Sequence, residues 1–226
     1  MKVLVVEDEH RLAENVKTGL TSLAGCAVDI AFNGEDGLHL AGQENYDVII
    51  LDLMLPKVSG DLLLQRLRAS GVSTPVLVLT AIDEKKSVIR LLDSGADDYL
   101  AKPFDMGELI ARVKTLIRRS FGHATSILRV EDLSLDINRR QVKRGSTAVD
   151  LRAMEYRVLE YLMARTGKVV SKSELLEHLY DYNWEKFSNV IEVYISGLRR
   201  KIDRDNTRKL IHTVRGLGYV VRADEE

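Results

Sequence analysis

The chain has 226 residues, of which 45% are hydrophobic and 30% charged, with a formal net charge of −1. This length exceeds the usual size of one domain, and the hydrophobic share is enough to build real cores. No run approaches about 18 consecutive apolar residues, and the sequence starts directly with a predicted strand, so we expect neither a membrane span nor an export signal. Cys26 is the only cysteine, which rules out an internal disulfide. Together these features predict a cytoplasmic protein.

Strands and helices alternate along the first half of the sequence. Short β-branched runs predict strands near 2–6, 26–31, 47–52, 75–79 and 98–101. Between them, helices are predicted near 10–23, 34–44, 60–69, 84–94 and 105–119. This alternation is typical of a doubly wound α/β domain, a parallel sheet with helices on both faces.

Polar residues stand where four of these strands end. They are Glu7-Asp8, Asp52, Thr80 and Lys102-Pro103. Because ligands bind at the carboxyl ends of parallel strands, we expect these groups to meet in one pocket. Three neighbouring ionised carboxylates require a cation, and Mg²⁺ is a hard ion that prefers oxygen ligands. Asp52 could then attack a phosphoryl group, with Lys102 offsetting the charge on its oxygens and Thr80 donating a hydrogen bond.

The alternation of strand and helix patterns ends at residue 119. Residues 120–126, Ser-Phe-Gly-His-Ala-Thr-Ser, lack periodicity and are predicted to form a short flexible linker. The runs ILRV, LSLDI, QVKRG and TAVDL then predict short strands, and helical patterns begin near Arg152, Lys172 and Asn189. Residues 212–221 predict a hairpin with Gly-Leu-Gly at its tip.

The helix that begins near Asn189 is the most informative element of the second half. Its hydrophobic residues recur at 191, 195, 198 and 202, as on one face of a helix. The opposite face is short, polar or basic, which suits the major groove of DNA, although a solvated helix face would look the same. The charges agree with a nucleic-acid reader, because residues 1–120 carry 14 Lys/Arg against 18 Asp/Glu, and residues 121–226 carry 19 against 16.

Residues 1–119 resemble the receiver domain of two-component response regulators, a CheY-like fold with strand order 2-1-3-4-5. The motifs that carry the resemblance are VLVVEDE, DVIILDLMLPKVSG, VLVLTA and GADDYLAKPF. It implies that Asp52 is the phosphoacceptor, that Thr80 and Lys102 assist the chemistry, and that Thr80 and Tyr99 form the switch. Tyr99 could equally be a half-buried sheet aromatic. The resemblance also implies a Lys102-Pro103 bond that is usually cis, and a Mg²⁺ site made of Glu7, Asp8, Asp52 and the backbone carbonyl of Met54.

Residues 127–223 resemble the smaller, α+β winged helix-turn-helix effector domain of OmpR/PhoB-type transcription factors. The matching motifs are LRAMEYRVLEYLM, VVSKSELLEHLY, SNVIEVYISGLRRKI and HTVRGLGYVV. The resemblance implies a recognition helix at 188–203 and a wing with its turn at 215–218. The Leu179–Phe187 segment, with Tyr180, Tyr182 and Trp184, matches a loop that often contacts RNA polymerase. The positions implied to contact DNA are Asn189, Val193, Tyr194, Ser196, Gly197, Arg199, Arg200, Thr213 and Arg215.

Two positions depart from the family pattern. Gly197 stands where many relatives have Arg, and Val88 stands where relatives carry a Lys or Arg that pairs with an acid matching Glu108. We still expect a receiver homodimer, because other charged residues of that surface are present. The residues implied at the dimer interface are Asp97, Asp98, Glu108, Arg112, Lys114 and Arg119.

The predicted function is therefore a transcriptional switch. A sensor histidine kinase phosphorylates Asp52, the receiver dimerises, and two effector domains bind tandem half-sites in double-stranded promoter DNA. Beyond its own phosphotransfer and dephosphorylation, no enzymatic activity is expected. Three alternatives stay open: a phosphatase-like enzyme, which would normally carry a second Asp where position 54 is Met; a phosphorylation-independent DNA binder with a degenerate receiver; and a signalling adaptor without a recognition helix.

Overall fold

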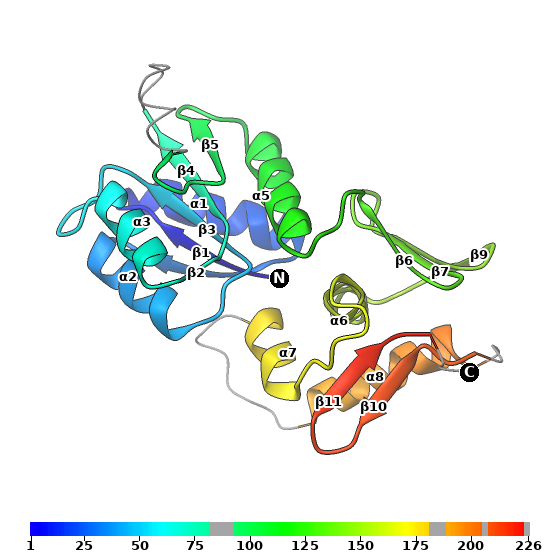
Figure 1. The fold of residues 1–226 in the computed structure, drawn as a ribbon. Helices are drawn as coiled ribbons and strands as arrows, with labels where there is room; N and C mark the ends of the chain where they lie inside the picture. Colours follow the sequence, from blue (N-terminus) through cyan, green and yellow to red (C-terminus); the bar gives the residue numbers. More distant parts are fainter. Residues whose placement is uncertain (82–92, 181–188, 205–207, 224–226) are drawn as a thin grey trace. The chain divides into compact units, whose positions relative to one another are not determined.

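The computed structural model describes residues 1–81, 93–180, 189–204 and 208–223. The chain divides into two compact units, Met1–Ser120 and Phe121–Glu226 (Figure 1). Each unit has its own secondary structure and buried core, and each is described by itself. Among the described residues, none of the helices has the length and hydropathy needed to cross a bilayer.

A five-stranded parallel sheet forms the centre of the first unit. Its strands lie in the order β2-β1-β3-β4-β5, as predicted. The residues of β1, β3 and β4 are all buried, because helices cover both faces of the sheet's centre. The strand bounds are Lys2–Val6 for β1, Ala27–Ala31 for β2, Val48–Asp52 for β3, Val76–Thr80 for β4 and Asp98–Ala101 for β5.

Helices pack on both faces of this sheet, which confirms the doubly wound fold. Helix α2 packs on β1, β2 and α3, whereas α5 packs on β3, β4, β5 and α1 (Figure 1). Alternate strand residues point to each side, so Leu4 and Leu51 share one core with Leu63 and Leu67 of α3. The helix bounds are His10–Gly19 for α1, Gly34–Gln43 for α2, Gly60–Ala69 for α3 and Met106–Ser120 for α5.

One predicted helix of this unit changes its helical type before its end, and another cannot be compared with the structure. The helix predicted at 10–23 is α-helical only to Gly19, and a π-helical turn over Leu20–Ala24 continues it. This turn ends at Gly25, whose φ of 72° is readily adopted by glycine. The helix predicted at 84–94 lies almost entirely outside the described residues.

The second unit combines a four-stranded antiparallel sheet, helices and a hairpin, as predicted for an α+β domain. The sheet contains β6 (Ile127–Val130), β7 (Leu133–Asp136), β8 (Gln141–Arg144) and β9 (Thr147–Val149). The helices are α6 (Ala153–Ala164), α7 (Lys172–Leu179) and α8 (Val190–Ile202). The hairpin consists of β10 (Ile211–Val214) and β11 (Gly218–Val221).

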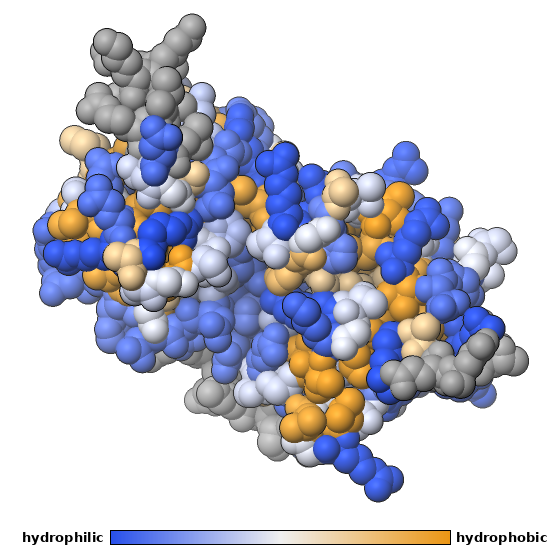
Figure 2. All heavy atoms as spheres, in the orientation of Figure 1, coloured by the Kyte–Doolittle hydropathy of each residue, from blue (hydrophilic) through white to orange (hydrophobic). Residues whose placement is uncertain are grey.

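The apolar stripe of α8 faces the core of this unit. Ile191, Ile195, Leu198 and Ile202 are all buried, which confirms the spacing predicted from the sequence. The hairpin is joined to the segment before α7 by a bridge between Val170 and Tyr219. Figure 2 shows hydrophobic side chains over this hairpin, with further hydrophobic side chains elsewhere on a face that is largely hydrophilic.

The start of the predicted linker is packed on the second unit. The guanidinium of Arg165 lies 3.5 Å from the ring centre of Tyr161 and 4.2 Å from that of Phe121. The His123 Nε2 atom lies 3.0 Å from the carbonyl oxygen of Ala164. Residues 121 and 123 therefore contact α6 and its C-terminal end, and the linker at 120–126 stays a prediction.

Candidate functional site

The polar residues at the carboxyl edge of the parallel sheet lie together, as their positions in the sequence predict. Glu7 follows β1, Asp52 ends β3, Thr80 ends β4 and Lys102 follows β5. The Lys102 ammonium group donates hydrogen bonds of 2.6 Å to Asp52 Oδ2 and 2.7 Å to Glu7 Oε2. The backbone of Lys102 is tied to β4, since its N–H donates to the Thr80 carbonyl at 2.8 Å.

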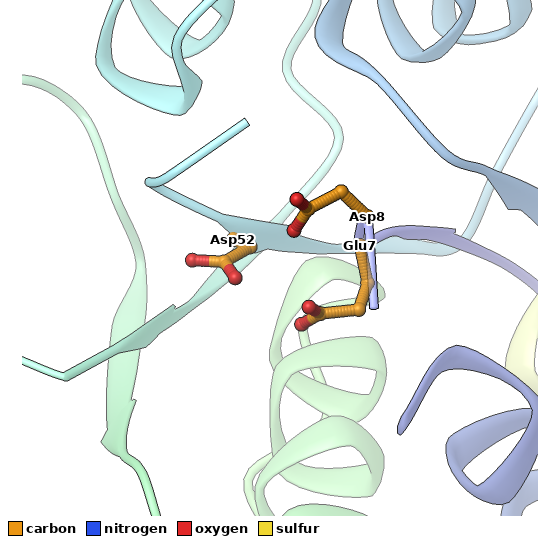
Figure 3. Close-up of side chains that lie close together, drawn as sticks. All are labelled: Glu7, Asp8 and Asp52. Atoms are coloured by element: carbon orange, nitrogen blue, oxygen red, sulfur yellow. The ribbon is translucent and has the colours of Figure 1, made fainter. Parts of the chain in front are cut away.

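Three carboxylates form the centre of this site. One oxygen from each of Glu7, Asp8 and Asp52 lies within 4.8 Å of the others, and Figure 3 shows these side chains side by side. Glu7 and Asp52 are only 1% and 6% exposed, whereas Asp8 is open to solvent. The site thus has a buried floor and an accessible mouth.

Burial and charge both act on the ionisable groups here. Burial is the main reason why the pKa of Glu7 is raised; the Lys102 bond opposes it and the nearby Asp52 charge adds to it. Burial alone would lower the pKa of Lys102, but its bonds to Asp52 and Glu7 outweigh burial and raise that pKa. With the carboxylates ionised, one ammonium offsets only one of three negative charges. The residues present therefore fit a divalent cation with hard oxygen ligands.

The loop after β3 fixes the Asp52 side chain. The Met54 N–H donates to Asp52 Oδ1 at 3.1 Å, while the Met54 side chain is exposed. Gly60, the first residue of α3, lies so close that a Cβ there would be 2.1 Å from the Asp52 carbonyl oxygen. Only glycine allows this approach without a backbone shift, so Gly60 holds the loop against the strand. A metal contact by the Met54 carbonyl stays a prediction.

The two residues predicted to form the switch lie on adjacent strands. Thr80 is buried at the end of β4. Tyr99 is half-buried in β5, opposite Val78 in the strand register, and packs against the core. Their role in signalling stays a prediction. The Lys102-Pro103 bond is cis, as the resemblance implied.

Most residues predicted at a dimer interface have partners within the chain. The Arg112 guanidinium contacts Asp98 at 2.9 Å and Glu108 at 2.8 Å. Asp97 accepts a hydrogen bond of 2.9 Å from Arg68. These contacts lie within one chain, and pairing of the same residues across a dimer stays a prediction. Lys114 and Arg119 lie half-buried and exposed on α5, and Val88 lies outside the described residues.

Helix α8 and the hairpin carry the residues predicted to contact DNA. Asn189, Val193, Ser196 and Arg200 are exposed on α8 or at its start, and line a groove of about 840 Å³ between α8 and the N-terminal end of α6. The apolar side chain of Val193 is 66% exposed on this face.

Other members of the predicted DNA-binding set contact the protein itself. Arg199 bridges to β10, donating to the Ile211 carbonyl at 3.0 Å and to Thr213 Oγ1 at 2.7 Å. The Tyr194 hydroxyl lies 2.9 Å from that of Tyr180. Arg215 is exposed in the hairpin turn. Of the segment predicted to contact RNA polymerase, Tyr182 and Trp184 lie outside the described residues.

Gly197 has a packing role that the sequence pattern did not reveal. It is buried, and a Cβ there would lie 2.5 Å from Glu155 Oε1. The Glu155 carboxylate accepts hydrogen bonds of 2.8 Å from the Arg152 N–H and 2.7 Å from the Lys201 ammonium. Gly197 thus leaves room for the group that joins the start of α6 to α8. A DNA contact at Gly197 stays a prediction.

Replacing Glu155 by Gln should weaken the second unit at neutral pH but not in acid. Burial alone would raise the Glu155 pKa, but the bonds from Lys201 and Arg152 lower it below its usual value of 4.5. A lowered pKa stabilises the fold above the unfolded-state pKa, and this stability is lost as pH falls through the folded-state pKa. We expect urea unfolding to separate Glu155→Gln from wild type at pH 7. The difference should shrink below about pH 4; a constant difference would contradict this role.

Comparison with known proteins agrees with this geometry. The family model described as response regulator receiver domain matches residues 3–114, and the one described as transcriptional regulatory protein, C terminal, matches residues 146–221. The transcriptional regulatory protein PcoR of Escherichia coli is 44% identical over 225 residues, which cover 100% of this chain and 99% of PcoR. This chain belongs to the OmpR/PhoB-type response regulators.

Further similarities support the assignment. CusR of Escherichia coli K12, a transcriptional regulatory protein, is 42% identical over 228 residues, covering 100% of this response regulator and 99% of CusR. The receiver domain of the Francisella response regulator 1452 has a TM-score of 0.51 and 43% identity, covering 53% of this chain and 98% of that domain. The predicted two-component, DNA-binding transcriptional regulator is thereby confirmed. The match of the second half to a transcriptional regulatory domain disfavours both the phosphatase-like enzyme and the adaptor.

Proposed function

We propose that phosphorylation of Asp52 by a cognate sensor histidine kinase switches this response regulator. The observation that supports this most is the buried Asp52 carboxylate, 2.6 Å from the Lys102 ammonium and beside two further acids. In the transfer, a bond forms between an Asp52 oxygen and phosphorus, while the bond between phosphorus and the donor imidazole nitrogen breaks. This transfer and the hydrolysis of the product are the only chemistry that the protein would assist.

The residues around Asp52 match the needs of this transfer. Lys102 and the Met54 N–H are already directed at the two carboxylate oxygens and would stabilise the charge on the phosphoryl oxygens. Glu7, Asp8, Asp52 and the Met54 carbonyl would hold Mg²⁺. When bound, the ion supplies positive charge that offsets the phosphoryl oxygens.

Phosphorylation would act on the rest of the protein through charge. It adds about −1.5 to −2 charges at pH 7, and Thr80 at the neighbouring strand end would donate to the new oxygens. Tyr99 on the adjacent strand would turn inward, and an existing equilibrium between two receiver conformations would shift. The surface of β5 and α5 would then form a homodimer through Asp97, Asp98, Glu108, Arg112, Lys114 and Arg119.

The effector domain would carry the output. We assign 1–119 to the receiver, 120–126 to the linker and 127–223 to the effector domain. Two effector domains in a dimer would bind half-sites about one helical turn apart in promoter DNA, through α8 and the hairpin. Linking two weakly binding domains can raise their joint affinity for DNA about 10²–10⁴-fold above that of either domain, without new contacts. The segment 179–187 would contact RNA polymerase.

Selection of bound sites from random duplex DNA tests this function. The full chain would be used with and without acetyl phosphate and Mg²⁺, and its mass in solution would be measured by light scattering in the same samples. We expect the treated protein to be dimeric and to enrich paired half-sites. Equally tight and equally selective binding by untreated, monomeric protein would instead establish the phosphorylation-independent DNA binder.

A further inference from the structure

A second groove lies at the C-terminal end of α8. It has a volume of about 430 Å³ and is lined by Arg199, Arg200, Asp203, Arg204, Lys209 and Ile211. Arg200 also lines the larger groove along the exposed face of α8. The two grooves therefore adjoin each other at this residue, and the second one extends the face of α8 towards β10.

This groove is strongly cationic. Four basic side chains and one carboxylate line it, and that carboxylate, Asp203, is buried. Asp203 accepts hydrogen bonds from the N–H groups of Leu210 at 3.1 Å and Ile211 at 3.2 Å, so it holds the start of β10 against α8. The groove therefore has three more basic than acidic side chains. Residues 121–226 as a whole have the same excess, because they carry 19 Lys/Arg against 16 Asp/Glu.

The cations of the α8 face are confined to this end. The exposed residues of its first turns, Asn189, Val193 and Ser196, are uncharged. The Lys201 ammonium is bonded to Glu155, and the Arg199 guanidinium is bonded to the hairpin. Arg200 in the last turn of α8 and Arg204, directly after its C-cap Asp203, are both exposed. Lys209 is exposed opposite them, and its ammonium donates to the backbone carbonyl of Asp203.

We propose that Arg204 and Lys209, together with Arg200, bind phosphates of the DNA backbone. The inference rests on the proposed DNA-binding function and adds two contact residues to it. The exposed, uncharged residues of the first turns of α8 would face base edges, while its basic end would fix the register on the duplex through phosphates. The charge of this groove is complementary to that of the DNA backbone, which supplies most of the salt-dependent affinity.

The test uses the double variant Arg204→Gln/Lys209→Gln in the full, unphosphorylated chain. Its binding to a fluorescent mixed-sequence duplex would be followed by anisotropy between about 50 and 200 mM salt. Each lost phosphate contact reduces the slope of log K against log salt by about 0.9, so we expect a reduction of about 1.8. The matched control is Arg129→Gln/Lys143→Gln, which removes an exposed Arg and an exposed Lys from β6 and β8. The control should keep the wild-type slope.

Two outcomes would overturn the proposal. Basic residues near a helix C-terminus also stabilise the helix dipole, so a lower melting temperature with an unchanged slope would assign Arg204 and Lys209 a structural role. An equal loss of slope in the control would mean that only overall charge matters. The single variant Arg204→Gln, with an expected loss of about 0.9, replaces the double variant if the latter does not fold. Wild-type protein that binds the duplex neither before nor after treatment with acetyl phosphate and Mg²⁺ would instead contradict the proposed binding of DNA through α8 and the hairpin.

Discussion

Replacing Asp52 by Asn should abolish phosphoryl transfer to the protein. The amide is nearly the same size as the carboxylate, so the site should keep its shape, but the amide oxygen is not a nucleophile at neutral pH. The two Asp52 oxygens accept hydrogen bonds from Lys102 at 2.6 Å and from the Met54 N–H at 3.1 Å, and the variant replaces one of these oxygens with an NH2 group. Intact mass spectrometry after treatment with acetyl phosphate and Mg²⁺ should show one added phosphoryl group in wild type and none in the variant.

A matched control separates this role from a general loss of acidity. Asp61 is exposed in the first turn of α3, the helix that follows β3, and is not one of the three clustered carboxylates. Asp61→Asn should accept the phosphoryl group like wild type. Undiminished labelling of Asp52→Asn would end the proposal that Asp52 is the acceptor.

Replacing Lys2 by Met should destabilise the receiver unit by about 3–5 kcal/mol, the usual cost of removing one partner from a buried ion pair. The Lys2 ammonium is buried, 2.8 Å from Glu44 Oε2 and 3.3 Å from Asp29 Oδ2. Asp29 is itself buried and accepts a hydrogen bond of 2.9 Å from the Tyr46 hydroxyl. The variant would leave the Asp29 carboxylate buried without its neighbouring cation. Urea unfolding of the full chain, followed by a probe in the receiver, would measure the change.

An exposed ion pair in the same unit provides the comparison. Lys57 lies 3.3 Å from Glu35, and both side chains are more than half exposed. Lys57→Met should change the free energy of unfolding by no more than about 1 kcal/mol, because exposed pairs contribute little. Similar effects of the two substitutions would show that burial does not govern the Lys2 cluster.

The parallel sheet and the candidate phosphoacceptor site could be predicted from the sequence because both follow from local patterns. Each short apolar run marks a strand, and the position of Asp52 or Thr80 at the end of its run determines the edge of the sheet at which it lies. The cationic groove had a partial signal, since Arg200 and Arg204 stand four residues apart around the C-terminal end of the predicted helix. That signal was incomplete because Lys209 joins the groove only through the fold.

Other features depend on contacts between residues far apart in the chain. Nothing near Gly197 in the sequence indicates that the Glu155 carboxylate lies against it. The contacts of Arg112 with Asp98, and of Phe121 with Arg165, likewise depend on how strands and helices pack. The spacing of hydrophobic residues along the sequence predicts which residues are buried, but it does not specify which side chains meet across a core.

The most direct test of the central claim is to locate the phosphoryl group in wild-type protein. After treatment with acetyl phosphate and Mg²⁺, borohydride reduction converts an aspartyl phosphate to homoserine, which peptide mass spectrometry can place in the sequence. We predict homoserine at position 52 and at no other aspartate. Homoserine elsewhere, or none after efficient treatment of folded protein, would contradict the assignment of Asp52 as the switch.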